Sequence, residues 1–278
     1  MEIGVGLPSG VPGCEPDLLL DWARRADELG FASLATVDRL LYGNWDPLVA
    51  LSAAAAVTRR IRLVTCILIS PLRETATLAK QVLGLDALSR GRVSLGLATG
   101  ARRDDYEASE TPYAGRGDRL GDQLVALRDH WESGEMGPAP TQPDGPPILL
   151  GGSGGAALGR MARHADGYIH GGGPARGFVR AATQAGAAWE DAGRPGHPRL
   201  WAMAYYALGD AVDTGREYML DYYAFTGAFA PRIAEELVTT PLALRELCDS
   251  YADAGCEQLL LFPAVATPDQ LERLADAR

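Results

Sequence analysis

Short apolar runs alternate with longer amphipathic segments along almost the whole chain. Residues 61–69 form a nearly continuous β-branched run, which is typical of a strand buried on both faces of a parallel sheet. In residues 16–29 the apolar side chains instead recur at helical spacing, and Gly30 marks the end of that helix. The pattern predicts strands at residues 3–7, 33–37, 61–69, 93–98, 148–150, 168–170, 201–208 and 258–262.

Helix-length segments fill the intervals between these strands. They are predicted at residues 16–29, 47–57, 75–88, 116–131, 156–164 and 178–192, in several pieces within 214–254, and from Pro268 onward. Eight strand–helix units in 278 residues favour a closed (β/α)8 TIM barrel over the alternative, an open doubly wound sheet. Because no composition break or long polar linker divides the chain, residues 1–278 are predicted to form one α/β domain.

Composition narrows the classes of function. Hydrophobic residues make up 47% and charged residues 22%, an ordinary globular balance, and the net charge of −10 disfavours nucleic acid as a partner. There is neither a signal-peptide pattern nor an apolar run of the roughly 20 residues that a membrane span needs, so a cytoplasmic protein without a membrane partner is expected. The scattered cysteines and histidines predict no metal site and no disulfide framework.

The loop after the fifth predicted strand is the clearest candidate site, because ligands of parallel barrels collect at loops that follow strands. It consists of Gly151, Gly152, Ser153, Gly154 and Gly155 and runs directly into a helix. Glycines let backbone N–H groups approach an anion, and a helix N-terminus adds positive potential. The loop is predicted to hold a phosphate; a merely flexible turn is the alternative.

Three other strand ends carry candidate residues. Asp38 and Arg39 end the second strand, where they fit a catalytic pair and a structural ion pair equally well. Thr99 and Gly100 follow the fourth strand, and their small size would let a flat ring lie there, although a plain loop is an equal alternative. Cys66, on the third strand, reads as a packed small residue rather than a reactive thiol.

An aromatic series follows the seventh strand. Tyr218, Tyr222, Phe225 and Phe229 are spaced by four, three and four residues, which predicts one face of a single helix. Packing of that face against the barrel or another subunit is favoured over a lid that covers a substrate. A homo-oligomer is therefore expected.

Several motifs in order resemble the luciferase-like monooxygenase superfamily. The resemblance extends over roughly the whole chain, and the order of the pieces is more specific than any one of them. The motifs are RIRLVT at 60–65, PLR at 71–73, LAKQ at 78–81, LDALSRGR at 85–92, VSLGLATG at 93–100 and PILLGGSGGAALGRMARHADGYI at 147–169.

The resemblance implies a (β/α)8 barrel that binds FMN or coenzyme F420, a deazaflavin. The ring would lie in the barrel mouth against the ends of strands three and four, beside a non-prolyl cis peptide at Cys66–Ile67. Thr99 and Gly100 would contact the ring or the ribityl chain, and the loop from Gly151 to Gly155 would hold the phosphate.

The sequence also departs from the family pattern. Relatives often carry a histidine where Arg39 stands, and the deazaflavin-dependent sugar-phosphate dehydrogenases carry a catalytic glutamate where Ala101 stands. The acid/base arrangement of those dehydrogenases is therefore missing, and Asp38 and Arg39 are the remaining candidates for proton handling and substrate orientation. The short connection at 137–147 predicts a more open mouth.

The resemblance implies an oxidoreductase that acts on a small organic substrate. With F420, which is slightly favoured, the reaction would be hydride transfer. With FMN, reduced by a partner reductase, it would be monooxygenation. A barrel that binds the cofactor without turnover and a flavin-free sugar-phosphate barrel are the alternatives.

Overall fold

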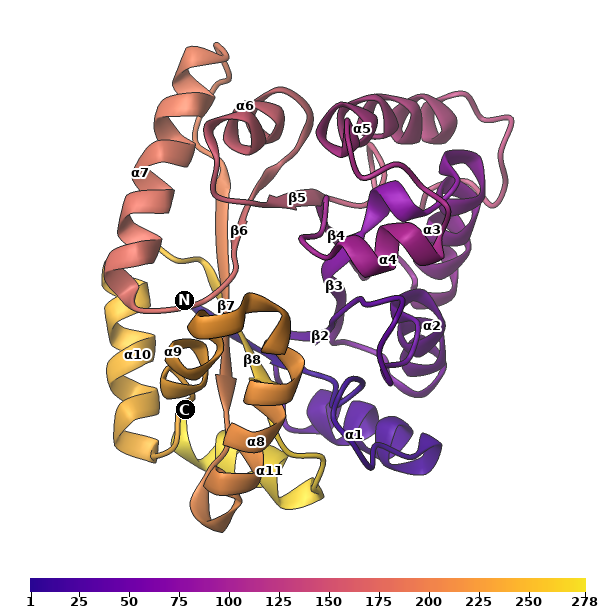
Figure 1. Cartoon of the computed structure of the whole chain (residues 1–278). Helices are drawn as coiled ribbons and strands as arrows, with labels where there is room; N and C mark the ends of the chain where they lie inside the picture. Colours follow the sequence, from indigo (N-terminus) through magenta and orange to yellow (C-terminus); the bar gives the residue numbers. More distant parts are fainter.

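The strands close into an eight-stranded parallel barrel in chain order (Figure 1). The computed structural model describes residues 1–278. The strands are β1 (Glu2–Gly6), β2 (Ser33–Thr36), β3 (Arg62–Ile69), β4 (Val93–Ala98), β5 (Ile148–Gly151), β6 (Gly167–His170), β7 (Arg199–Tyr206) and β8 (Gln258–Pro263). β1 pairs with β8, with Val5 opposite Leu261, and this pairing completes the barrel. The TIM-barrel prediction is confirmed, and the predicted strands are all present.

Helices surround the barrel, one or more after each strand (Figure 1). They are α1 (Pro16–Glu28), α2 (Pro47–Val57), α3 (Thr75–Ser89), α4 (Arg103–Ala108), α5 (Arg116–Glu132), α6 (Gly155–His164), α7 (Ala175–Asp191), α8 (Val212–Tyr222), α9 (Ala230–Glu235), α10 (Pro241–Asp253) and α11 (Pro268–Ala277), with 3-10 turns η1 (Ser70–Leu72), η2 (Gly209–Ala211) and η3 (Ala224–Phe229). No helix has the length and apolarity to cross a membrane. The short helix α4 was not among the predicted elements.

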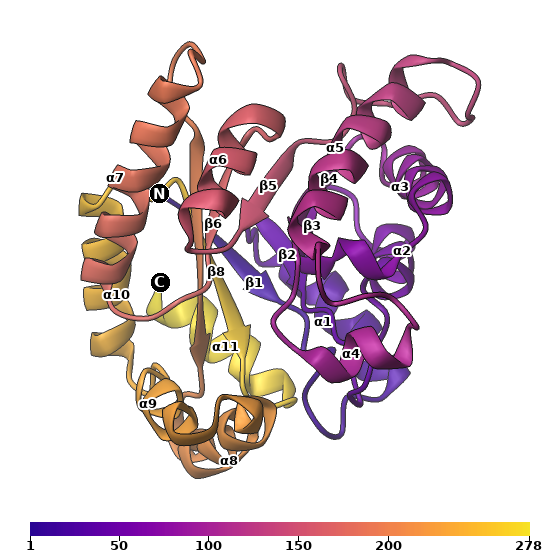
Figure 2. The same ribbon diagram turned by 45° about the horizontal axis from the view of Figure 1, so that its top comes forward.

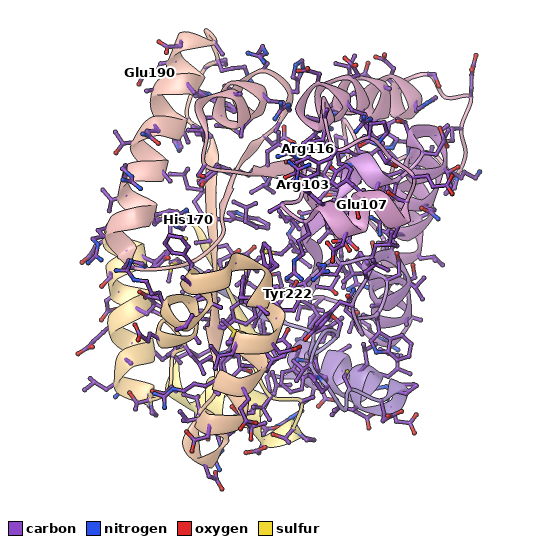
Figure 3. The ribbon with its side chains drawn as sticks, in the orientation of Figure 1. Arg103, Glu107, Arg116, His170, Glu190 and Tyr222 are labelled. Carbon is purple, nitrogen blue, oxygen red and sulfur yellow. The ribbon has the colours of Figure 1, made fainter.

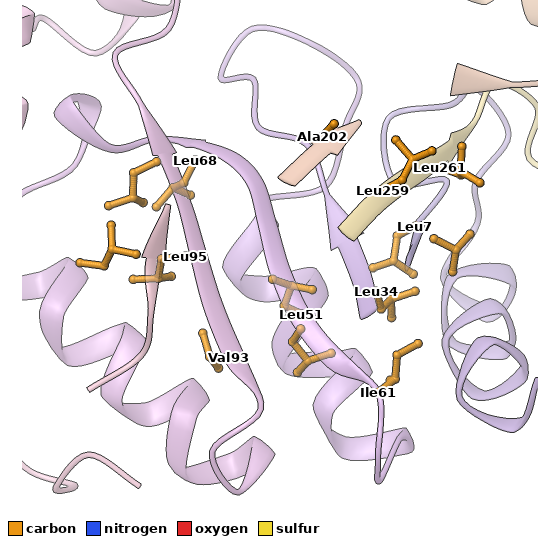
Figure 4. Packing of buried hydrophobic residues seen from close by; sticks show 14 of the residues in the cluster. Leu7, Leu34, Leu51, Ile61, Leu68, Val93, Leu95, Ala202, Leu259 and Leu261 are labelled. Atoms are coloured by element: carbon orange, nitrogen blue, oxygen red, sulfur yellow. The ribbon is translucent and has the colours of Figure 1, made fainter. Parts of the chain in front are cut away.

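The barrel separates two apolar clusters. Alternation along β7 illustrates the division: Ala202 and Ala204 face the surrounding helices, whereas Trp201, Met203 and Tyr205 face the barrel interior. The outer cluster, between strands and helices, is the larger, and Figure 4 shows part of it. The inner cluster extends to the C-terminal ends of the strands, so its buried side chains form the floor of any site at that end of the barrel.

The C-terminal ends of the strands form the mouth, where α4, α8 and α9 lie (Figure 2). The aromatic series there does not form one helix face, so that prediction is wrong. Tyr218 and Tyr222 are buried, but Phe225 and Phe229 lie in η3 and are 48% and 63% exposed. Gly227, at φ 60° and ψ −122°, adopts a conformation that glycine tolerates and a continuing helix does not.

Candidate functional site

The end of β3 carries a β-bulge. β3 and β4 pair regularly as far as Thr65 opposite Leu95, and the pairing resumes at Leu68 opposite Leu97, so β3 contains one extra residue. The peptide bond Cys66–Ile67 within this bulge is cis, as the family resemblance implied.

A small apolar surface spans the ends of β3, β4 and β5. A Cβ added to Gly151 would lie 3.0 Å from Cδ1 of Ile67 and 3.5 Å from Cβ of Ala98, so these residues are in close contact. Gly100 has φ 67°, and a Cβ there would lie 2.8 Å from Cγ2 of Ile69, so the β4 loop also stays close to β3. The strand ends therefore pack so closely that a side chain larger than glycine would collide with Ile67 or Ile69 at these two positions.

Cys66 and Thr99 flank this surface. Cys66 is 3% exposed within the inner cluster, and burial raises the pKa of its thiol, which keeps it neutral. Thr99 is half-buried, and its carbonyl oxygen accepts a hydrogen bond from the Tyr106 hydroxyl of α4. Cys66 thus packs as a small residue, as predicted. Contact of either residue with a cofactor stays a prediction.

The glycine loop leads into the N-terminus of α6, as predicted. Gly154 is the N-cap, and no side chain caps the helix, so its first N–H groups are available to an anion. Gly152 has φ 125°, and a Cβ there would lie 2.9 Å from Cβ of Ala157. Gly155 and Ser153 are exposed. The loop therefore has the open, side-chain-poor form that a phosphate needs.

Arginines gather beside this loop, and sequence reasoning missed them. Arg103 and Arg116 stack on the ring of Tyr113, with Cζ 4.3 and 3.7 Å from its centroid, between α4, α5 and β5 (Figure 3). Nε of Arg116 and Nη1 of Arg119 are buried without a hydrogen-bond partner. Neither residue forms an ion pair, nor does Arg160. In a chain of net charge −10, three guanidinium groups without carboxylate partners indicate an anion site.

Arg160 connects this arginine cluster to the glycine loop. It is carried by α6, the helix that the loop opens, and a Cβ on Gly117 of α5 would lie 2.5 Å from its Nη2. The pKa of Arg160 is lowered, mainly by burial and also by the charge of Arg163, although the nearby Asp118 raises it. The arginines Arg116 and Arg119, three residues apart at the start of a predicted helix, were the signal in the sequence.

Asp38 and Arg39 do not pair with each other. Asp38 accepts hydrogen bonds from the backbone N–H of Ile69 at 2.8 Å and from Nη1 of Arg73 at 2.7 Å. Arg39 donates through Nε to Asp105 of α4 at 2.9 Å. Both side chains are buried and tie the β2 loop to its neighbours. A catalytic role for either residue stays a prediction.

A group of tyrosines lies on the β7 side of the mouth, and sequence reasoning found two of its members, Tyr218 and Tyr222, but missed Tyr205 and Tyr223. The Tyr205 ring contacts those of Tyr218 and Tyr223 at 6.4 and 5.9 Å between centroids. Tyr222 lies beneath Cζ of Arg102, 4.9 Å from its ring centroid (Figure 3). Burial raises the pKa of all four phenols, so they remain neutral hydrogen-bond donors.

A family model described as luciferase-like monooxygenase matches residues 1–277. The chain belongs to the luciferase-like monooxygenase family. An uncharacterised protein of Mycobacterium tuberculosis (strain H37Rv) is 35% identical over an aligned length of 208 residues, and the match covers 62% of this chain and 71% of that protein. Pyrimidine monooxygenase RutA of Rhizobium rhizogenes is 31% identical over an aligned length of 162 residues, and the match covers 49% of this chain and 44% of RutA.

Solved structures of other proteins share the luciferase-like fold. The monooxygenase RslO1 of Streptomyces bottropensis superposes with a TM-score of 0.81 at 23% identity, over 100% of this chain and 96% of that one. An F420-dependent secondary alcohol dehydrogenase, solved with an F420–acetone adduct, gives 0.83 at 16% identity, over 100% and 98%. At sequence identities of 23% and 16%, these superpositions show a shared fold and no shared activity. Family membership is confirmed and makes the chain an oxidoreductase by class; it leaves flavin and deazaflavin both open.

Proposed function

We propose that this chain is an oxidoreductase that binds a reduced flavin or deazaflavin at the mouth of its barrel and acts on a small organic molecule. The glycine loop and the three arginines of α5 and α6 hold the phosphate, while Cys66, Ile67, Thr99 and Gly100 border the ring and its chain. The observation that carries the proposal is the uncapped helix N-terminus of α6 and the nearby arginines without carboxylate partners, together with the apolar residues at the ends of β3, β4 and β5. A flavin or deazaflavin likewise has an apolar planar ring at one end and a phosphate at the other.

The bound cofactor would supply the hydride or oxygen chemistry, and the protein supplies orientation and a dry surface. We favour the deazaflavin and hydride transfer because the Cys66–Ile67 bulge and the strand at 93–100 resemble deazaflavin-dependent relatives. The F420-dependent alcohol dehydrogenase with the same fold agrees with this preference. RutA, a pyrimidine monooxygenase, supports the alternative, in which FMN reduced by a partner reductase drives monooxygenation.

Charge placed in the loop tests the phosphate site. Gly154 has φ −89°, and a Cβ there would meet nothing within 4 Å, so other residues fit without strain. Aspartate is a good N-cap, so Gly154→Asp should leave the fold at least as stable. It would also face the phosphate with a like charge, so we expect at least roughly tenfold weaker binding. Gly154→Asn, which has nearly the same shape without the charge, is the matched control.

Binding is measured by fluorescence titration of the three proteins with F420 and with FMN, and stability by thermal unfolding. We expect either F420 or FMN to bind. That cofactor should have similar affinity for the native protein and for Gly154→Asn, and a much lower affinity for Gly154→Asp. Equal affinity of all three proteins would refute the phosphate site. Absence of binding by either cofactor would refute the function. Stopped-flow mixing of the reduced complex with oxygen or an acceptor then separates turnover from mere binding.

A further inference from the structure

A cavity of ≈ 520 Å³ lies on the β6–β7 side of the mouth, beneath α9. Its walls are mainly apolar, with Met219 of α8, Ile233 of α9 and Leu247 of α10 among them. The loop at 171–173 consists of three glycines, and a Cβ on Gly172 would lie 3.0 Å from the carbonyl oxygen of Met203, so the backbone comes close to β7. The volume is typical of pockets for small organic molecules.

Two tyrosines supply the hydroxyl groups of the cavity wall. The Tyr223 hydroxyl donates to the Tyr205 hydroxyl at 3.4 Å, and their rings meet edge to face. The Tyr205 hydroxyl makes no other hydrogen bond, so its own proton has no acceptor in the protein. Burial raises the pKa of both hydroxyl groups, that of Tyr223 to about 12. At neutral pH the pair therefore presents one unused O–H donor.

The tyrosine pair also belongs to the surroundings of the β3 bulge. Tyr205 belongs to the same buried cluster as Cys66, which forms the cis bulge with Ile67. The proximity of Cys66 contributes to the raised pKa of Tyr223. Tyr223 therefore lines the cavity and is also close enough to Cys66 of the bulge to be influenced by it.

We infer that the cavity takes a neutral, mostly apolar carbonyl compound, whose oxygen accepts a hydrogen bond from Tyr205. The inference deepens the proposed function and rests on it for the reaction, although not for the binding. Arg232 and Glu236, the charged residues of the lining, are exposed and of opposite sign. A buried ionic substrate would have no partner, which makes a neutral one the better fit.

The same contact serves the reduction of a carbonyl group. The hydride of a reduced deazaflavin or flavin forms a C–H bond at the carbonyl carbon, and the π electron pair of C=O moves to oxygen. That oxygen takes the Tyr205 proton and becomes an alcohol, while the cofactor is left oxidised by two electrons. Tyr223 returns a proton to Tyr205 and recovers one from water. The pair would thus supply the proton that neither Arg39 nor Ala101 provides.

The test uses the cofactor-free protein and calorimetric titration with two probes of similar shape, 1-tetralone and tetralin. One hydrogen bond from Tyr205 should make the ketone bind up to roughly tenfold more tightly than the hydrocarbon. Tyr205→Phe should remove that preference. Tyr218→Phe is the matched control, because Tyr218 belongs to the same aromatic group but does not line the cavity. Ile233→Trp, which fills the cavity, should weaken binding of both probes.

A ketone preference that is present in the native protein and Tyr218→Phe but lost in Tyr205→Phe supports the inference. Equal affinity for the two probes in the native protein would overturn it, as would a preference that survives in Tyr205→Phe. A circular dichroism spectrum and an unfolding temperature establish that each variant is folded. These titrations contain no cofactor, so their outcome is independent of the F420 and FMN titrations. If the protein binds the ketone as expected but binds neither cofactor, the proposed function is refuted and the inference about the cavity is not.

Discussion

At the scale of the residue, Arg39 forms a buried ion pair with Asp105 of α4. Its side chain is 5% exposed and its partner Asp105 is 0% exposed, so neither charge reaches solvent. Replacing Arg39 with methionine leaves Asp105 buried without its cation, and we expect unfolding in urea to show a loss of roughly 3 kcal/mol. The double variant with Asp105→Asn should recover part of that loss.

Arg59 offers a control for that experiment, since it is exposed and forms no ion pair. Arg59→Met should change the free energy of unfolding by less than about 0.5 kcal/mol. A similarly small change in Arg39→Met would mean that the buried pair does not hold the β2 loop, and a catalytic role for Arg39 would gain weight.

The sequence predicted where Asp38 and Arg39 lie but not which groups they contact. The side chains of adjacent residues in an extended segment point to opposite sides. An ion pair between Asp38 and Arg39 is therefore geometrically unfavourable. Their partners, Arg73 and Asp105, come from the loops after β3 and β4. Such contacts depend on how strand ends meet around the barrel, which no local pattern encodes.

At the scale of the element, Asp27 fastens α1 to the turn that begins β3. Its carboxylate accepts the backbone N–H groups of Arg59 and Ile61 at 2.8 Å and of Arg60 at 3.1 Å. Burial raises its pKa, but these bonds lower it further than burial raises it. Asp27→Asn should therefore cost about 1–3 kcal/mol at neutral pH.

The sign of the pH dependence follows from the lowered pKa. The stabilisation is complete above the unfolded-state pKa, near about 3.9, and is lost as the pH falls through the lower folded-state pKa. Urea unfolding should thus give the same gap between native protein and Asp27→Asn at neutral pH and near pH 5, and a smaller gap only in stronger acid. Asp21→Asn, which alters an exposed pair with Arg24, is the control. A gap that already shrinks above pH 5 would contradict the assignment.

Elements with their own hydrophobic pattern were predictable, and those held by distant contacts were not. The buried strands carry their pattern locally, so each was found. The six residues of α4 are mostly polar and lack apolar periodicity, and Tyr106 and Asp105 fix them to other loops. The break before η3 likewise coincides with a distant contact, because the Arg102 guanidinium stacks on Phe225 at 3.9 Å and binds the Tyr222 carbonyl.

At the scale of the whole molecule, the charge of the chain and the charge of the site oppose each other. The net charge of −10 repels an anionic cofactor at long range, whereas Arg116, Arg119 and Arg160 attract its phosphate at short range. Salt screens both effects, and in the bound state the attraction at short range is the larger of the two. The glycine loop was predictable because it is contiguous; the arginines, from two helices, meet only in the fold.

This opposition predicts a salt dependence that differs between native protein and a variant. Arg160 makes no hydrogen bond or ion pair within the chain, so Arg160→Gln should leave the unfolding temperature nearly unchanged. In the native protein, cofactor affinity should fall as salt rises, because the local attraction dominates the bound state. In Arg160→Gln we expect roughly tenfold weaker binding and a shallower decline with salt, since one charged hydrogen bond to the phosphate is lost. Arg176→Gln, a change of equal charge on α7 and far from the loop in sequence, should reproduce neither effect. Parallel salt curves for native protein and Arg160→Gln would exclude Arg160 from the phosphate site and leave the helix N-terminus as its main source of positive potential.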